Sequence, residues 1–190
     1  QIEIRSFPSC RPLPRVHRST RLEHTLSTAQ PSHATADPAF DPSFKTLRVP
    51  PLAGRTGAEI HDLKLSASLD EDTFSQLYAA LLKHKVVFLR GQDHLDDAQH
   101  QGFGARFGKT VAHPTVPARE GTRIFELDAS KGGGRADSWH TDVTFIDAFP
   151  KVSILRGVTI PAYGGDTVWA NAVAAYESLP DHLRQLAERL

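Results

Sequence analysis

The tetrapeptide Trp139-His140-Thr141-Asp142 combines residue types and a spacing that suit metal chemistry. It lies in a strand-like run, residues 138–145, and on a strand the side chains of residues i and i+2 point to the same face. The imidazole of His140 and the carboxylate of Asp142 can therefore converge on one ion. Such a pair supplies two of the three protein ligands of a facial 2-His-1-carboxylate iron(II) site, which leaves positions open for other ligands.

This spacing alone is weak evidence, because a second pair, His94 and Asp96, has the same spacing. That second pair stands between a predicted strand and a predicted helix, where Asp96 or Asp97 can cap the helix. We therefore interpret it as structural. For the first pair the alternative to a metal site is a polar strand edge that faces solvent, and spacing does not decide between the two.

Composition excludes several classes of function. The 22 Lys and Arg residues balance the 22 Asp and Glu residues, so no basic field attracts nucleic acid or anionic lipid. No apolar run approaches the roughly 18 residues of a membrane span. The single Cys10 cannot form an internal disulfide or a thiolate metal site. We expect a cytoplasmic protein without nucleic-acid or membrane partners.

Both ends of the chain indicate a fragment. There is no methionine, residue 1 is Gln, and a helical pattern at positions 183, 186, 187 and 190 runs to the last residue without an exit signal. Residues 1–44 hold six of the 13 prolines and no glycine, a composition typical of disorder. We interpret this segment as a disordered or non-native leader, with a transit peptide as the alternative for its arginines.

The remaining chain predicts helices first and many short strands after them. A capping pattern at residues 68–71 precedes an apolar stripe to Leu82, and a second helix runs from Asp96 or Asp97 to Gly108. Asn171 is expected to cap a helix over residues 172–178. Strands are predicted at residues 46–49, 58–61, 85–90, 123–127, 138–145, 152–160 and 167–170. Without βαβ alternation, this order favours a mainly β fold with flanking helices, an antiparallel α+β arrangement.

From about Val49 to Leu190 the sequence resembles the taurine dioxygenase family of Fe(II)- and 2-oxoglutarate-dependent oxygenases, in particular its bacterial alkyl sulfatase members. The matching stretches are residues 57–60, 84–92, 111–117, 139–145 and 164–171. The resemblance implies a double-stranded β-helix, or jelly roll, with helices packed outside. It also implies that residues 45–190 are the N-terminal part of a catalytic domain, so that the jelly roll is incomplete in this chain.

The same resemblance implies roles for individual residues. His140 and Asp142 are similar to the first two iron ligands, and Thr167 to the hydroxyl that binds the far carboxylate of the cosubstrate 2-oxoglutarate. His113 and Val143 match positions that contact the sulfate or sulfonate substrate. The alternatives are ordinary strand packing for Val143 and a surface histidine for His113.

Two groups of the family site are expected beyond residue 190, namely the third iron ligand and the arginine that binds 2-oxoglutarate. His182, the only histidine after Asp142, is predicted to lie on a helix beside Pro180 and Asp181. It is a poor substitute for the third ligand. The chain as it stands is therefore expected to be inactive.

The implied reaction uses dioxygen and 2-oxoglutarate to hydroxylate the carbon that bears a sulfate ester, which releases an aldehyde and inorganic sulfate. Taurine-selective members tend to have Tyr and Asn where this chain has Val116 and Ala136, so an alkyl chain is favoured over an amine. Alternatives are a dioxygenase of taurine, another sulfonate or an aryloxyalkanoate, a non-catalytic remnant of the fold, and a zinc hydrolase that lacks a third ligand and a general base. We expect the full-length protein to form a homo-oligomer.

Overall fold

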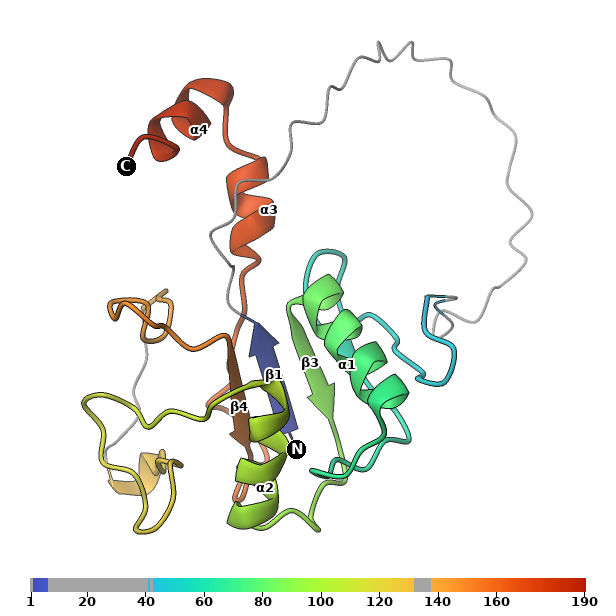
Figure 1. Ribbon diagram of the computed structural model, residues 1–190. Coiled ribbons are helices and arrows are strands. Elements are labelled where there is room, and N and C mark those ends of the chain that lie inside the picture. The colour runs from blue at the N-terminus through green and yellow to red at the C-terminus, as the bar shows by residue number, and fades with distance from the viewer. Residues whose placement is uncertain (1, 7–40, 42, 132–137) are drawn as a thin grey trace.

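A computed structural model describes residues 2–6, 41, 43–131 and 138–190 (Figure 1). Its strands are β1 (Ile2–Ser6), β2 (Ala58–Glu59), β3 (Val86–Leu89) and β4 (Val152–Arg156). The α-helices are α1 (Glu71–His84), α2 (Asp97–Gly104), α3 (Ala172–Glu177) and α4 (Asp181–Ala187). Two short 3₁₀ helices, η1 (Ala105–Phe107) and η2 (Ala129–Lys131), complete the regular elements of the described part.

The strands form one four-stranded sheet in the order β2-β3-β1-β4. Strand β1 is antiparallel to both of its neighbours, so that Ile4 lies opposite Val87 on one side and Ile154 on the other. Strand β2 runs parallel to β3. Figure 1 shows β1 between the other two long strands. The sheet therefore brings together segments from the beginning, middle and later part of the chain.

Helix α1 forms where the sequence predicts it and supplies much of the core. Asp70 caps its first turn, because the carboxylate accepts a hydrogen bond from the Thr73 N–H at 2.9 Å. The cap thus lies two residues later than the start of the expected pattern. The helix packs against β1 and β3. Its buried side chains are Phe74, Leu77, Ala80 and Leu81.

Helix α2 also follows the prediction. The Asp96 carboxylate accepts from the Gln99 N–H while the Gln99 side chain accepts from the Asp96 N–H, which completes a capping box. The expected structural role of Asp96 is confirmed. The helix passes into η1 and ends at Gly108, whose φ of 138° is open to glycine but costly for other residues. Phe103 and Phe107 meet edge to face with ring centroids 5.5 Å apart.

Several predicted strands are absent from the described residues. Residues 123–127, 138–145 and 167–170 are not in strands, and β4 ends at Arg156 instead of residue 160. A strand is stabilised by hydrogen bonds to a neighbouring strand, and these segments have no neighbour in the described sheet. More described residues lie in helices than in strands. The described part is therefore a mixed helix and strand structure, in which the expected helices are present and fewer strands form than predicted.

The expected lack of structure over residues 1–44 does not hold for the first residues of that segment. Residues Ile2–Ser6 form β1, and Phe44 is buried in the core. The alternation of Ile2, Glu3, Ile4 and Arg5 has the period of a strand, and the proline-rich composition of the residues that follow obscures it. Residues 7–40 lie outside the part that the structure describes.

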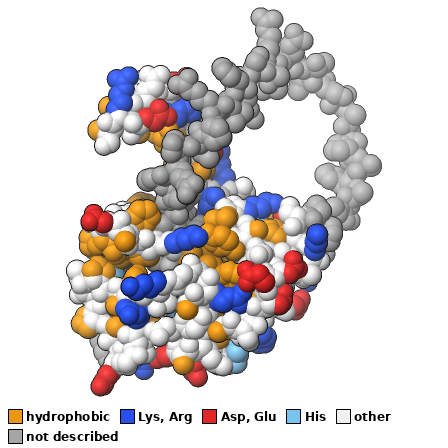
Figure 2. All heavy atoms as spheres, in the orientation of Figure 1, with side chains coloured by type: hydrophobic (Ala, Val, Ile, Leu, Met, Phe, Trp, Pro, Cys, Tyr) orange, Lys and Arg blue, Asp and Glu red, His pale blue; other side chains and the backbone are white. Residues whose placement is uncertain are grey.

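The C-terminal part of the chain packs loosely. Neither α3 nor α4 has a buried residue, and Figure 1 shows both helices away from the sheet. Large apolar side chains are exposed there, as the space-filling view in Figure 2 illustrates for one face of the molecule. They include Val158, Ile160, Tyr163, Val168, Leu183 and Leu186. None of the helices in the described ranges combines the length and apolarity needed to cross a membrane.

Candidate metal centre

His140 and Asp142 lie together, as the sequence predicts. The Nε2 atom of His140 is 3.0 Å from Oδ1 of Asp142, and the two side chains are 49% and 27% exposed. They are not on a strand, because residues 138–145 form an irregular turn. The sequence predicts that a strand places these two side chains on one face. In the structure a turn brings them together instead. Trp139 and Phe145 on either side are largely exposed.

The imidazole of His140 is oriented for a ligand role. Its Nδ1 lies 2.8 Å from the carbonyl oxygen of Ser138, and because that oxygen can only accept, Nδ1 carries the proton. Nε2 lies within ion-pair distance of the Asp142 carboxylate when the ring carries both protons, and in a neutral ring with its proton on Nδ1 the same atom offers a lone pair to a cation. Two metal ligands at right angles with bonds of about 2.1 Å lie about 3.0 Å apart. The pair therefore fits two adjacent positions on a metal ion.

Val143 follows the pair directly and has a strained backbone. Its φ is 53°, which is unfavourable for a β-branched residue, and its side chain is 9% exposed. The alternative for this residue, ordinary strand packing, does not apply, since Val143 lies in a turn; the expected substrate contact stays a prediction. Strained backbone of this kind costs roughly 1–3 kcal/mol and is concentrated at functional sites. The conformation bends the chain immediately after Asp142.

His113 lies on a separate loop and is held by local contacts. Its Nδ1 accepts hydrogen bonds from the Thr115 N–H at 3.2 Å and the Val116 N–H at 3.1 Å. The ring also meets Phe125 with centroids 5.1 Å apart. Because Nδ1 accepts, the neutral ring carries its proton on Nε2. His113 is thus half-buried, fixed in orientation and able to donate one hydrogen bond from Nε2.

Thr167 is exposed in the segment between the turn at Gly164 and Gly165 and helix α3. Both glycines have positive φ values, 80° and 71°, so the predicted turn is confirmed. The structure brings His140 and Asp142 together but places His113 and Thr167 on different segments. Ala136, one of the two apolar positions predicted to favour an alkyl chain, lies outside the described residues.

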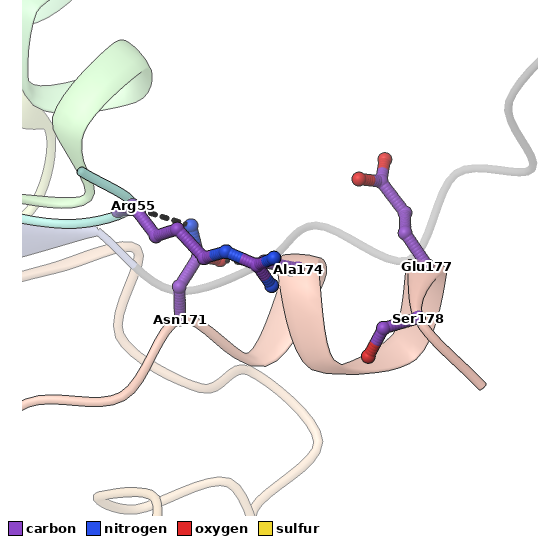
Figure 3. Close-up of a pocket in the computed structure, with 5 residues that line it drawn as sticks. All are labelled: Arg55, Asn171, Ala174, Glu177 and Ser178. Atoms are coloured by element: carbon purple, nitrogen blue, oxygen red, sulfur yellow. Dashed lines mark hydrogen bonds between the residues drawn. The ribbon is translucent and has the colours of Figure 1, made fainter. Parts of the chain in front are cut away.

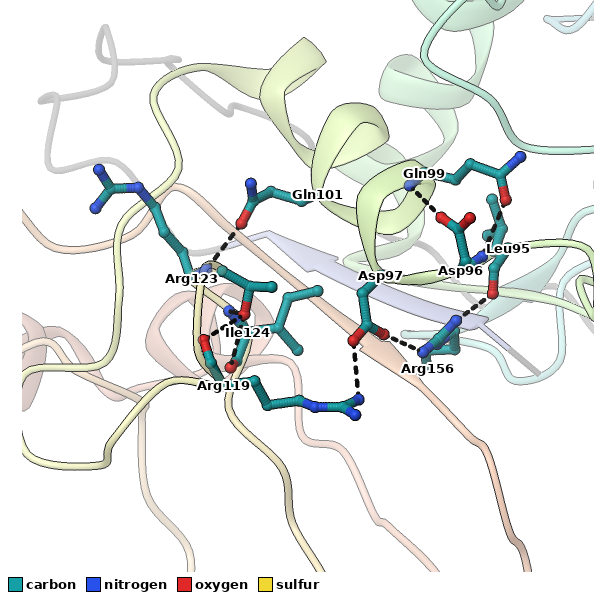
Figure 4. Close-up of polar contacts among 10 residues, drawn as sticks. Leu95, Asp96, Asp97, Gln99, Gln101, Arg119, Arg123, Ile124 and Arg156 are labelled. Carbon is teal, nitrogen blue, oxygen red and sulfur yellow. Dashed lines mark hydrogen bonds and ion pairs between the residues drawn. The ribbon is translucent and has the colours of Figure 1, made fainter.

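A polar network on α2 positions the loop that carries His113, and the sequence interpretation did not find it. Asp97 accepts hydrogen bonds from Arg119 of this loop at 2.8 Å and from Arg156 of β4 at 2.5 Å, as Figure 4 shows. Gln101 accepts from the Arg123 N–H at 2.8 Å. Partners some 20 to 60 residues apart leave no periodic signal in a sequence, so only the structure shows them.

A surface depression of the described part lies elsewhere. A shallow depression of about 360 Å³ is lined by residues of α3 and by Arg55 (Figure 3). Asn171 donates a hydrogen bond to the Arg55 carbonyl oxygen at 2.6 Å across it. Neither member of the candidate metal pair lines this depression. The hydrogen bond from Asn171 to Arg55 joins α3 to the rest of the chain. The depression is not lined by His113 or Thr167 either.

The pair supplies two ligands, and the described ranges contain no group of three or more His, Cys, Asp or Glu side chains placed to hold a metal ion. His182 lies on α4, as predicted. The donor set of one imidazole and one carboxylate suits iron(II), which such sites bind through two histidines and one carboxylate. A third ligand would complete the facial site.

Comparison with known proteins identifies the family. Residues 48–190 match the taurine catabolism dioxygenase TauD, TfdA family. Because this match covers most of the chain, the protein belongs to that family. The matched range begins next to the predicted domain start at residue 45.

Two curated bacterial relatives are each 57% identical to the chain. One is an alpha-ketoglutarate-dependent sulfate ester dioxygenase of Pseudomonas putida, matched over 80% of this chain and 50% of the relative. The other is an alkylsulfatase of Acinetobacter baylyi, matched over 76% of this chain and 45% of the relative. The chain spans about half the length of these relatives.

A solved structure supports the fold. The crystal structure of a taurine dioxygenase from Burkholderia xenovorans is 38% identical and superposes with a TM-score of 0.58. The match covers 75% of this chain and 51% of the other. The described chain therefore has the fold of about half of a taurine dioxygenase.

Proposed function

We propose that the chain is part of an Fe(II)- and 2-oxoglutarate-dependent dioxygenase that hydroxylates the carbon bearing a sulfate ester. The observation that carries this proposal is the 57% identity with the sulfate ester dioxygenase of Pseudomonas putida. The proximity of the His140 and Asp142 side chains supports it independently, because an imidazole and a carboxylate side by side are two of the three ligands that such a site for iron(II) needs.

In this proposal His140 and Asp142 hold the iron. Bound iron, with 2-oxoglutarate and dioxygen, supplies the oxidising chemistry that replaces a C–H bond of the substrate by C–OH. The bond from His140 to the Ser138 carbonyl oxygen fixes both the tautomer and the ring orientation, which is the usual role of such a contact behind a metal ligand. The bend at Val143 turns the chain away immediately after the carboxylate.

His113 is proposed to anchor the anionic group of the substrate. Its Nε2–H donates to a sulfate oxygen, and the three-point contact of the ring with its own loop and with Phe125 limits its rotation. Val143 is proposed to contact the same substrate. The hydroxyl of Thr167 is proposed to bind the far carboxylate of 2-oxoglutarate.

The chemistry of the product completes the reaction. A hydroxyl group on the carbon that bears a sulfate ester makes an unstable hemiacetal-like compound. This compound separates into an aldehyde and inorganic sulfate, with the hydroxyl proton leaving as the carbonyl forms. The protein needs only to hold the ester in place and to keep water from competing.

The proposed domain is a jelly roll of which this chain is one part. Its support is the superposition on half of a taurine dioxygenase and the coverage of half of each curated relative. The homo-oligomer and the cytoplasmic location stay predictions.

A sulfonate such as taurine is the second candidate substrate, because the solved structure that matches is a taurine dioxygenase. The half-buried Val116 favours the sulfate ester of an alkyl chain instead, since an apolar side chain offers an amine no hydrogen bond. The two candidates share the iron chemistry and differ only in the substrate.

A chimera tests the proposal. Residues 48–190 of this chain replace the corresponding half of the Pseudomonas putida relative, and succinate and sulfate release are measured with a medium-chain alkyl sulfate and with taurine. We expect greater stimulation by the alkyl sulfate. Equal or greater stimulation by taurine would refute the proposed substrate. No turnover of either compound by a folded chimera would refute the dioxygenase activity.

Two variants of the chimera test the metal pair. The Asp142→Asn variant is expected to be inactive. The Asp147→Asn variant, which changes a nearby exposed aspartate, is expected to stay active.

A further inference from the structure

Strand β1 holds the described sheet together. Strand β4 is the last strand of the order β2-β3-β1-β4, so β1 is its one strand neighbour in the described part. All five residues of β1 pair with β4, and four of them pair with β3. Without β1, the facing edges of β3 and β4 would expose unpaired N–H and C=O groups.

This strand lies outside the family domain, although both of its neighbours lie inside. The family match begins at residue 48 and includes β3 and β4, whereas β1 ends at Ser6. A buried backbone edge without partners is costly, so a domain of this family that lacked β1 would need another segment in the same place. The chain covers only about half of its curated relatives.

We propose that β1 occupies the place of a strand from the half of the domain that this chain does not cover, and that the two segments compete for it. The inference rests on membership of the family and does not require the proposed function. The recognition mode is strand addition, in which backbone hydrogen bonds on both edges give affinity and buried alternate side chains give specificity.

The chemistry of the position supports such an exchange. Ile4 is fully buried in a cluster that includes Val87 and Leu89, and Ile154 packs against that cluster. Any occupant must therefore carry an apolar side chain at this point and complete the backbone hydrogen bonds of both neighbouring edges. Because β1 belongs to the same chain as its two neighbours, it acts as an intramolecular ligand of this place. A strand that is part of a larger folded half would displace it by burying more surface.

Disulfide trapping tests the competition directly. Residues 4 and 154 are Cα partners, so Ile4→Cys with Ile154→Cys, in a Cys10→Ser background, should form a disulfide in the chain of 190 residues. The same substitutions are then placed in a longer protein, made by appending the uncovered half of the Pseudomonas putida relative, with its cysteines replaced by serine. We expect trapping to be at least tenfold slower in the longer protein.

Equal trapping rates in the two proteins would overturn the proposal, and so would failure of the pair to form in the chain of 190 residues. The matched control is Ala58→Cys with Val87→Cys, whose Cα atoms are partners in the β2–β3 pair. This control pair should be trapped equally in both proteins, because β2 and β3 stay paired whichever strand lies on the other side of β3.

Amide hydrogen exchange gives a second measurement that needs no cysteine. In the chain of 190 residues we expect protection of residues 2–6 and 152–156, and Ile4→Asp should remove both while Ile4→Val keeps them. In the longer protein residues 2–6 should exchange freely while residues 152–156 stay protected, with or without Ile4→Asp. Protection of residues 2–6 in the longer protein would overturn the proposal.

Discussion

At the scale of single residues, the candidate site depends on which nitrogen of His140 carries a proton. The Ser138 carbonyl oxygen accepts a hydrogen bond from Nδ1, so that in a neutral ring the nitrogen facing Asp142 is the one with the lone pair that a metal ligand needs. The spacing of the pair predicts the proximity of these side chains correctly, because residues i and i+2 are close in a tight turn as well as on a strand. The contact with Ser138 could not be read from the sequence.

The first prediction concerns metal binding by the chain itself. Two adjacent ligands should bind Co²⁺ or Mn²⁺ weakly, and Asp142→Asn should lower the affinity at least tenfold, because the amide lacks the negative charge of the carboxylate. Isothermal titration calorimetry measures the affinity. Asp147→Asn is the control, since this exposed aspartate lies in the same turn and has no histidine partner among the described contacts. Equal affinity of the two variants would contradict the assignment.

The second prediction concerns the substrate anion. In the chimera His113→Phe should raise the KM for an alkyl sulfate about tenfold or more, since a hydrogen bond to a charged group is worth about 1.5–3 kcal/mol. Phe keeps the ring contact with Phe125 and removes the donor. Steady-state sulfate release gives KM and kcat separately. Thr115→Val, which changes only a local partner of the ring, should leave KM nearly unchanged, and an equal rise for both variants would count against the anchor.

At the scale of elements, the sequence predicts what is local. Helices α2 and α3 begin at the predicted caps Asp96 and Asn171, and α1 begins at Asp70, within the predicted capping pattern of residues 68–71, because a cap and its apolar stripe lie within a few residues of each other. Strands depend on distant partners. The apolar run at residues 123–127 stays irregular for lack of a neighbour, whereas Ile2–Ser6 becomes a strand because β3 and β4 flank it.

The third prediction tests the core of α1. Leu77 is fully buried, so Leu77→Ala should lower the free energy of unfolding by about 2–5 kcal/mol through lost burial and an unfilled cavity. Leu82 on the same helix is 47% exposed, and Leu82→Ala should cost less than about 1 kcal/mol. Urea unfolding followed by circular dichroism measures both. Similar losses for the two variants would show that α1 does not pack as described.

The fourth prediction concerns pH and the contact of α2 with β4. Burial lowers the pKa of His100 from its ordinary value of 6.5, and the positive charge of Arg156 lowers it further. A backbone hydrogen bond with Ile154 and the negative charge of Asp97 raise this pKa but do not outweigh the lowering. The unfolded chain then binds a proton at higher pH than the folded chain, so stability falls as pH drops below about 6.5. His100→Phe should reduce this fall between pH 7 and pH 5, as measured by urea unfolding. An unchanged fall would exclude His100 as its source.

At the scale of the whole molecule, the chain has a packed part and an exposed part. The core lies almost entirely between Phe44 and Phe103, with Ile4 added by β1. The candidate site and helices α3 and α4 belong to the part where large side chains such as Trp139 and Tyr163 are exposed. Sequence position alone does not show whether His113 and Thr167 share a site, because they lie on segments far apart in the chain. Among the described residues, no hydrogen bond joins His113 to Thr167.

The last prediction follows from this uneven packing. Helix α1 should exchange its amide hydrogens only by global unfolding, whereas α3 and α4, which bury no side chain, should exchange through local opening at least a hundredfold faster. The Asn171 bond to Arg55 alone is worth only about 1 kcal/mol, too little to change that order. Exchange followed by mass spectrometry compares residues 71–84 with residues 172–187.

The chimera extends this measurement. There the half supplied by the Pseudomonas putida relative should cover the exposed apolar side chains of α3 and α4 and slow their exchange to a rate near that of α1. Equal protection of all three helices in the chain alone would show that α3 and α4 are stable without further contacts.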